Sequence, residues 1–349
     1  MPGMEEVAVN TRVLYAPVTG VQRYATELLA RWDGMVHPIA PSSSLHGLAG
    51  HAWEQCVLPA KLHGRLLFSP SNTGPLGTDR QVLTVHDMSV FDWPEGFSPR
   101  FAAWYRFLLP KLLQRALRII TDSEFTKGRI LAHVDIRPEK ITVIPCGVSP
   151  HFRPEAISEA GKAIASQKLP SRNYILTVGS LEARKNLARL FRAWGQVWER
   201  MPEDLWLVVV GGKGSGRVFA NVQVDRMPPR VFLADRVDDS ELPALYAGAL
   251  GLAYVSLYEG FGLPPLEAMA SGIPVLVGNR SSLPEVVGDA GILVDPENEE
   301  EIAEGIRALV ENSALRRDLR ERGLLRARKF SWDETARRTW HVLQAAAAN

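Results

Sequence analysis

The chain of 349 residues has only two cysteines, Cys56 and Cys146, with no CxxC pair and no cluster of histidines. Neither a disulfide framework nor a zinc site of the usual spacing is therefore expected. No stretch reaches the ~18 apolar residues of a membrane-spanning helix, and the acidic residues 1–6 lack the basic and apolar regions of a signal peptide. These absences favour the cytoplasm, with any membrane contact peripheral and at the inner face.

An excess of charge of one sign is also lacking. The 40 Lys and Arg residues against 39 Asp and Glu residues leave a net charge of +1, which argues against a dedicated nucleic-acid binder. Apolar residues make up 46% of the chain, enough for large hydrophobic cores, so intrinsic disorder is excluded. The length exceeds the ~150 residues of one usual domain, and two domains are expected.

Short apolar runs alternate with helix-length amphipathic segments through both halves of the chain, which predicts α/β domains with parallel sheets. The expected strands are 7–15, 81–85, 118–121 and 141–145 in the first half, and 174–178, 205–210, 230–233, 252–257 and 274–277 in the second. Ligands bind at the carboxyl ends of such strands. Polar residues that directly follow a strand are therefore the first candidates for a site.

The segment 154–172 is rich in Ala, Ser, Glu and Lys and contains Pro170, which is typical of a domain boundary. We expect a first domain over 1–165 and a second over 166–330. The remaining residues, 331–349, are expected to form a final amphipathic helix.

The most informative segment, 258–272, follows a strand and opens a helix. Gly260 and Gly262 let the backbone pass close to a ligand, and free amides at the helix start can hold an anion. Glu259 and Glu267 stand eight positions apart and can accept hydrogen bonds from hydroxyl groups at different ends of one extended ligand. A sugar nucleotide fits this pattern. The alternative is that Glu267 caps or salt-bridges locally and the glycines only turn the chain.

A second cluster, 179–186, follows the first strand of the second domain. Arg184 offers a planar fork and Lys185 a compact charge, so the pair can neutralise a diphosphate leaving group. The alternative is a solvated helix start. Positive charge at a helix N-terminus opposes the helix dipole, however, and so indicates a compensating anion.

Together these segments resemble the retaining nucleotide-sugar glycosyltransferases of glycosyltransferase family 4. The resemblance extends over nearly the whole chain, and within the family it is closest to bacterial mannosyltransferases of surface-polysaccharide assembly. It rests on the Glu-x7-Glu spacing of Glu259 and Glu267, the Gly-x-Leu-Glu-x-Arg-Lys-Asn segment 179–186, and the first-domain segments 19–24, 86–101 and 144–148. It implies the GT-B fold: two Rossmann-like domains facing across a cleft, with a C-terminal helix crossing back to the first.

The resemblance also implies roles for individual residues. Arg184 and Lys185 bind the donor diphosphate, Glu267 binds the ribose hydroxyls, and His86 reaches the donor sugar and the reaction centre. Ser180 stands where many family members carry Arg, so we infer that Arg184 supplies the missing charge. The other implied donor-binding positions are Gly20 near the phosphates, and Glu259, Gly260, Phe261, Gly262 and Leu263 facing the transferred sugar. Separately, the glycine-rich loop 211–216 follows the expected strand 205–210, and we expect its Gly212 near the nucleotide.

The implied reaction is metal-independent transfer of a hexose with retained stereochemistry, without a cofactor. The expected donor is a nucleotide sugar, with GDP-mannose preferred over a UDP-sugar as the interpretation. The expected acceptor is a glycan or a lipid-linked saccharide. Two alternatives stay open: a UDP-sugar-dependent transferase with another acceptor such as a natural product, and a non-catalytic protein that only binds nucleotide sugars. Nucleic acid is not expected as a partner.

The segment 99–118 mixes aromatic and basic residues at helical spacing, with Pro110 expected to interrupt or kink the helix. Such mixing is typical of helices that dock on anionic lipid, and peripheral membrane contact is one interpretation. The other interpretation is that the apolar side chains of this helix form a stripe that packs into the protein core.

Overall fold

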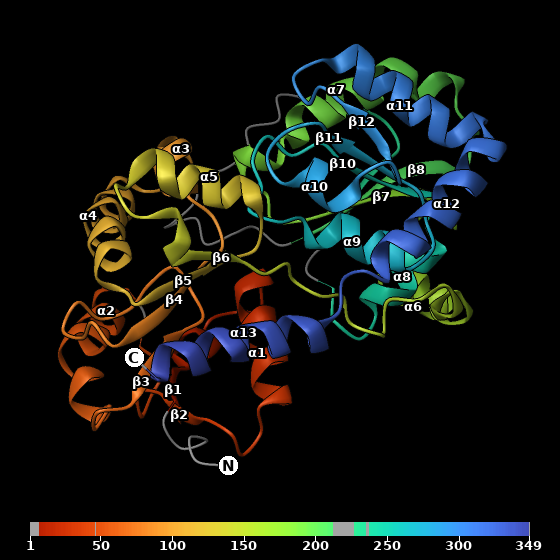
Figure 1. The fold of residues 1–349 in the computed structure, drawn as a ribbon. Coiled ribbons are helices and arrows are strands. Elements are labelled where there is room, and N and C mark those ends of the chain that lie inside the picture. The colour runs from red at the N-terminus through yellow and green to blue at the C-terminus, as the bar shows by residue number, and fades with distance from the viewer. Residues whose placement is uncertain (1–6, 46, 212–226, 235–236, 349) are drawn as a thin grey trace. The chain divides into compact units, whose positions relative to one another are not determined.

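The computed structural model describes residues 7–45, 47–211, 227–234 and 237–348, and the chain divides into two compact units (Figure 1). The first unit contains the residues up to Asp92, Arg100–Gly147 and the segment from Ser331. The second contains Trp93–Pro99 and Val148–Phe330. Each unit is built around its own parallel sheet.

The first unit has a six-stranded sheet in the order β2-β1-β3-β4-β5-β6, and all its strand pairs are parallel. The strands are β1 Val7–Asn10, β2 His37–Ile39, β3 Leu66–Ser69, β4 Gln81–Val85, β5 Arg118–Thr121 and β6 Ile141–Val143. The central strands are buried along their whole length. Because helices cover both faces of the sheet, the sequences of these strands are continuous apolar runs and do not alternate between apolar and polar residues.

The helices of the first unit are α1 Gly20–Arg31, α2 Gly47–Cys56, α3 Ser89–Asp92, α4 Pro99–Arg115, α5 Glu124–His133 and α13 Trp332–Ala347. Helix α1 begins with a capping box, in which the Thr19 backbone amide donates to Gln22 Oε1 over 2.9 Å. The final helix α13, drawn in blue, lies alongside α1, drawn in red (Figure 1). Trp332, at its first turn, is fully buried against the ring of Tyr24.

The expected strand over 7–15 is too long. Strand β1 ends at Asn10, and a 3-10 helix follows over Arg12–Tyr15. The Asn10 side chain accepts a hydrogen bond from the Arg12 backbone amide at 3.3 Å and turns the chain out of the sheet. Pro110 does not interrupt α4, which continues through it from Pro99 to Arg115.

The second unit repeats the architecture with a sheet in the order β12-β11-β10-β7-β8-β9, again parallel throughout. Its strands are β7 Asn173–Val178, β8 Leu205–Val210, β9 Val231–Ala234, β10 Gly251–Tyr254, β11 Val275–Gly278 and β12 Ile292–Val294. Its helices are α6 Ala160–Ser166, α7 Leu187–Val197, α8 Leu242–Gly248, α9 Leu263–Ala270, α10 Leu283–Val287, α11 Glu299–Glu311 and α12 Ser313–Ala327. The predicted α/β class with two parallel sheets is confirmed.

The first unit gives way to the second at Gly147, well before the expected boundary at 165. The segment that reads as a linker is folded and packs on α8. The ring centroids of Phe152 and Tyr246 lie 5.6 Å apart, and Gln167 Nε2 donates to Glu241 Oε2 over 2.7 Å. These contacts assign 148–166 to the second unit.

Within the described part of the chain, no helix combines the length and the apolar character needed to cross a membrane.

Candidate active site

The loops that follow strands β7, β8, β10 and β11 lie at the carboxyl edge of the second sheet, because the strands are parallel. Two of these loops are in close backbone contact. A Cβ atom on Gly211 would lie 1.8 Å from the carbonyl oxygen of Gly179, and Gly179 N donates to Val210 O over 2.9 Å. Only glycine fits at 211, so the loops after β7 and β8 are held together at the point where both leave the sheet.

The carboxylate of Glu259 is the centre of an ion-pair cluster at this edge. Its Oε1 atom accepts hydrogen bonds from Lys185 Nζ at 2.7 Å and from Tyr254 Oη at 2.6 Å, and its Oε2 atom lies 3.1 Å from Arg184 Nη1. Burial alone would raise the pKa of Glu259, but Lys185 and Arg184 more than offset it and lower the pKa to about 2. Glu259 is therefore a carboxylate at neutral pH, although it is only 7% exposed.

Lys185 is held from two sides. Besides Glu259, its Nζ donates to Tyr254 Oη over 2.8 Å and lies 5.3 Å from the centre of the Tyr254 ring. Burial and the neighbouring Arg184 lower the pKa of Lys185, while the carboxylates beside it act in the opposite direction. Burial and the Glu259 charge raise the pKa of Tyr254, which keeps its hydroxyl protonated as a donor.

Arg184 is fixed by a second carboxylate, Glu182, whose Oε2 accepts from Arg184 Nε over 2.7 Å. The other oxygen of Glu182 accepts from the hydroxyl of Ser180. Arg184 Nη1 also donates to the carbonyl of Tyr258 at 3.2 Å. Two cations and two carboxylates thus form a charge-balanced group, and Ser180 belongs to it through Glu182.

The glycine-rich loop leads from Glu259 into α9. Ser282, fully buried on the neighbouring loop, donates to the carbonyls of Glu259 at 2.9 Å and Phe261 at 2.6 Å. Gly262 precedes the helix with φ +120°, a backbone conformation that disfavours a side chain. Leu263 is the first helical residue, and Glu267 is a buried side chain further along α9, at 5% exposure. Gly260 lies within this loop, so the amides of 260–263 are held at the start of the helix.

His86 follows β4 in the first unit and is held at both ring nitrogens. Nδ1 lies 2.7 Å from Asp122 Oδ2, and Nε2 lies 3.1 Å from the carbonyl oxygen of Pro70. Both partners are acceptors, so the contacts favour the form of His86 in which both ring nitrogens carry hydrogen. Burial alone would lower the pKa of His86, but the charge and hydrogen bond of Asp122 outweigh it and raise the pKa.

The remaining predicted site residues are Gly20 and Gly212. Gly20 is the first residue of α1, which follows β1 and the 3-10 helix Arg12–Tyr15. Gly212 lies outside the described residues. The structure therefore brings together Ser180, Arg184, Lys185 and Glu259, with the loop 260–263 joined directly to them, whereas His86 and Gly20 lie in the first unit.

Three residues of these networks were not predicted: Tyr254, Glu182 and Ser282. Asp122 directly follows the strand expected over 118–121 and so was among the first candidates for a site. Glu182 had a usable signal, since it is a carboxylate in the loop 179–186 already identified as a ligand-facing position. Tyr254 and Ser282 had none, because their contacts depend on neighbouring strands and loops. Over the described residues, no group of three or more His, Cys, Asp or Glu side chains is arranged to hold a metal ion.

Comparison with known proteins gives two family matches, "Glycosyl transferases group 1" over residues 162–326 and "Glycosyltransferase Family 4" over residues 62–152. The chain is 32% identical over 374 residues to O-antigen chain mannosyltransferase B of Escherichia coli, covering 96% of this chain and 98% of the relative. It is 30% identical over 237 residues to O-antigen chain mannosyltransferase RfbU of Salmonella typhimurium, covering 67% of this chain and 62% of the relative.

Among solved structures, the sucrose-phosphate synthase from Thermosynechococcus elongatus matches with a TM-score of 0.78 at 20% identity. The match covers 99% of this chain and 100% of the synthase chain. The similarity therefore extends over both units.

Proposed function

Since the chain belongs to glycosyltransferase family 4, we propose that it transfers mannose from GDP-mannose to a glycan or lipid-linked acceptor, with retention of configuration. The predicted GT-B fold and the predicted transferase class are confirmed. The donor, the acceptor and the stereochemistry are the proposal. The observation that carries it is the cluster of Arg184, Lys185 and Glu259 at the carboxyl edge of the second sheet, in a chain 32% identical to an O-antigen mannosyltransferase.

Arg184 and Lys185 would bind the donor diphosphate. A diphosphate carries more negative charge than Glu259 and would compete with it for Arg184 and Lys185. Both cations are already held in position, Arg184 by Glu182 and Lys185 by Tyr254. Glu259 would then be released toward the hydroxyl groups of the transferred sugar, and Glu267 would accept from the ribose. The cations and the amides at the start of α9 supply the positive charge that the leaving group needs, so the proposal requires no metal ion.

In the reaction, the bond between the anomeric carbon of the sugar and the diphosphate oxygen breaks, and its electron pair leaves with the diphosphate. The acceptor hydroxyl oxygen attacks from the face that the nucleotide leaves. Its proton passes to a phosphate oxygen of the leaving group. No protein nucleophile takes part, and His86 would orient and polarise the reacting groups.

The test is a transfer assay with labelled GDP-mannose and UDP-glucose, alongside thermal shift with GDP and UDP. We expect GDP to stabilise the protein by mass action and GDP-mannose to be turned over. Lys185→Ala and Glu267→Ala should weaken nucleotide binding, and His86→Ala should lower turnover with binding preserved. Turnover of the UDP-sugar alone would reassign the donor, and binding without turnover of any donor would indicate a nucleotide-sugar binding protein.

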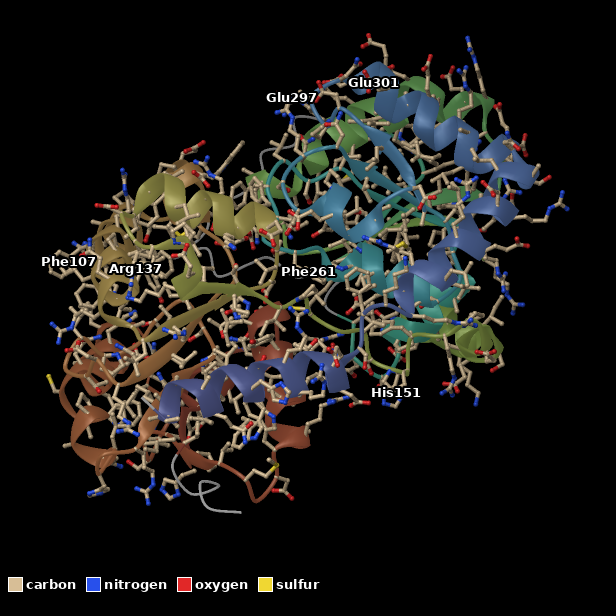
Figure 2. The ribbon with its side chains drawn as sticks, viewed as in Figure 1. Phe107, Arg137, His151, Phe261, Glu297 and Glu301 are labelled. Atoms are coloured by element: carbon tan, nitrogen blue, oxygen red, sulfur yellow. The ribbon has the colours of Figure 1, made fainter. Side chains whose placement is uncertain are left out.

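We further propose that helix α4 contacts anionic lipid through its exposed face. Phe107 is 54% exposed there and projects outward (Figure 2), with Lys111 Nζ 4.7 Å from its ring centre. The face also carries Arg100, Arg106 and Arg115, and α4 contains no Asp or Glu. The opposite face, with Leu108 and Leu112, is packed in the core. An aromatic side chain among cations suits a phosphate-rich headgroup layer.

Co-sedimentation with vesicles tests this contact. Binding to phosphatidylglycerol vesicles and not to phosphatidylcholine vesicles is expected. Arg106→Gln with Lys111→Gln should weaken it about 30-fold at ~1 kcal/mol per cation, whereas Leu325→Ser, another exposed apolar position, should not. Equal binding of the charge-deleted variant would contradict the proposal.

A further inference from the structure

An aromatic ring from a distant part of the chain packs against the glycine-rich loop of the second unit. Phe330 follows α12 and is the last residue of that unit. Its ring centroid lies 5.9 Å from that of Phe261, with 69° between the ring planes, which is the edge-to-face arrangement that aromatic pairs prefer. Phe261 is only 7% exposed and lies just before α9 (Figure 2). The loop that carries Glu259 is therefore held at its aromatic ring by a residue outside it.

Arg326, in the last turn of α12, binds both this ring and the end of α10. Its Cζ atom lies 5.4 Å from the centre of the Phe330 ring, and its Nε atom donates to the carbonyl of Val286 over 3.0 Å. Its Nη2 atom donates to the carbonyl of Glu285. The last carbonyls of a helix have no intrahelical partner, and a guanidinium satisfies two of them here. Arg326 thus connects the Phe330 ring to α10.

The start of α10 holds the same loop by its backbone. Ser282 precedes α10 and donates to the carbonyls of Glu259 at 2.9 Å and Phe261 at 2.6 Å. Leu283, the first residue of α10, lies so close that a Cβ atom on Gly262 would be 2.9 Å from its Cδ2 atom. The loop is therefore supported twice, at its backbone by α10 and at its ring by the segment that follows α12.

The backbone of Phe330 is fixed as well. Its carbonyl accepts a hydrogen bond from the Val148 amide over 3.3 Å, and its own amide donates to the carbonyl of Ala327 over 3.0 Å. Val148 begins the long segment of the second unit, and Phe330 ends it. Because Phe330 is held at its backbone by these bonds and at its ring by Arg326, it can fix the position of the loop that packs on it.

We propose that Phe330 is a positioning residue for the transferred sugar. It keeps the loop 259–263 in the arrangement in which the Glu259 carboxylate and the backbone amides face the sugar of the donor, so this inference rests on the proposed function. The diphosphate has separate support, because Arg184 and Lys185 lie on the loop after β7. Loss of the ring contact should therefore weaken recognition of the sugar and leave binding of the nucleoside diphosphate nearly unchanged.

Calorimetry on the full chain compares the Kd of GDP-mannose with that of GDP. Phe330→Leu keeps an apolar side chain and removes the ring. We expect its Kd for GDP-mannose to rise about 3- to 10-fold, the usual range for loss of an aromatic pair, while its Kd for GDP changes by less than about twofold. Phe330→Tyr keeps the ring and should bind both ligands as wild type does. Leu325→Ala, at a 61% exposed position on α12, is the matched control and should also match wild type.

A second variant covers the case in which circular dichroism shows that Phe330→Leu is unfolded. Arg326→Gln frees the ring from α10 and should raise the Kd of GDP-mannose relative to that of GDP in the same direction. If UDP-glucose and UDP are the pair that wild type binds, the comparison is made with them, since the ring contact does not involve the base.

The outcomes separate this inference from the proposed function. If wild type binds a nucleotide sugar, but Phe330→Leu leaves both Kd values unchanged or raises both by the same factor, the role of Phe330 alone is overturned. A Phe330→Tyr protein that changes the ratio of the two Kd values as much as Phe330→Leu has the same meaning. A wild-type protein that binds neither nucleotide sugar overturns the proposed function, and the role of Phe330 falls with it.

Discussion

Lys185 Nζ and Glu259 Oε1 form a 2.7 Å ion pair between side chains that are 11% and 9% exposed, and Tyr254 Oη bonds to both partners. The pair joins the loop after β7 to the loop after β10. A buried charge destabilises the folded protein when its partner is removed. Replacing one member of this pair should therefore lower the stability more than replacing both.

Lys185→Met should weaken nucleoside diphosphate binding about 10- to 100-fold, the usual range for a hydrogen bond to a charged group. It should also destabilise the protein, since Glu259 then keeps only Arg184 as a charged partner. In the double variant Lys185→Met with Glu259→Gln, stability should recover while nucleotide binding stays weak. Thermal denaturation and calorimetry with GDP measure the two effects, and recovery of binding in the double variant would contradict the role of Lys185.

The stability contributed by Glu259 should depend on pH. Its pKa is lowered to about 2 from the ordinary 4.5, so the contribution is complete above 4.5 and is lost as the pH falls through about 2. The stability difference between wild type and Glu259→Gln should therefore shrink by about 2 kcal/mol on going from about pH 6 to about pH 2.5. Urea denaturation at both pH values tests this, and a constant difference would mean that Glu259 is not paired.

Asp122→Asn should lower the pKa of His86, because Asp122 is the group that outweighs burial and raises it. The stabilising effect of charged His86 is complete below its ordinary 6.5 and is lost as the pH rises through the raised value. Asp87, Tyr24 and the Cys146 thiol also face this pair. We expect the variant to lose turnover at lower pH than wild type while its donor KM stays constant. NMR titration of the His86 ring checks the shift directly, and an unchanged midpoint would refute the pairing.

Glu182→Gln should strengthen GDP binding. The substituted amide oxygen can still accept from Arg184 Nε, so the geometry is kept while the balanced cluster gains one net positive charge. We expect about fivefold tighter binding at low ionic strength, with the gain shrinking as salt is added. Glu297→Gln, at an ion-paired carboxylate that is 49% exposed on the same unit, is the control. Weaker binding in Glu182→Gln would show that the charge on Glu182 is needed to hold Arg184.

The sequence was sufficient to predict the features whose signal is local. Fully buried strands such as β4 and β8 read as unbroken apolar runs, because parallel strands are covered on both faces. Glu259, Arg184 and Lys185 were predicted because they directly follow strands, and the parallel arrangement brings strand ends to one edge.

What the sequence could not predict depends on contacts between distant positions. In the sequence, Tyr254 looks like an ordinary strand residue. Its hydroxyl joins the ion-pair cluster only because Lys185 lies on the loop after β7, the strand next to β10. Strand β2 has only three residues, two of them exposed, and carries no apolar run to recognise. The burial of Glu54 on α2 was not predicted, because a single glutamate in a helix normally faces solvent, whereas here hydrogen bonds from Asn10 and Thr73 make its burial favourable.

Two glycines of the first unit should respond in opposite ways to alanine. Gly147 lies where a Cβ atom would be 2.1 Å from the backbone nitrogen of Trp332, and backbone cannot move aside as a flexible side chain can. Gly147→Ala should therefore displace the start of α13 and destabilise the protein by about 3 kcal/mol or more. Gly128, within α5, has open space around it, with no neighbouring atom within 4 Å of where a Cβ atom would lie. Gly128→Ala should therefore stabilise the protein by about 0.5–1 kcal/mol.

Urea denaturation of both glycine variants, followed by circular dichroism, measures the change in the free energy of unfolding of each variant relative to wild type. The two substitutions add the same methyl group in the same unit, so each is the matched control for the other. A Gly147→Ala protein as stable as wild type would mean that the chain crossing at 147 and 331 is not closely packed, because a close backbone crossing has no room for the added carbon.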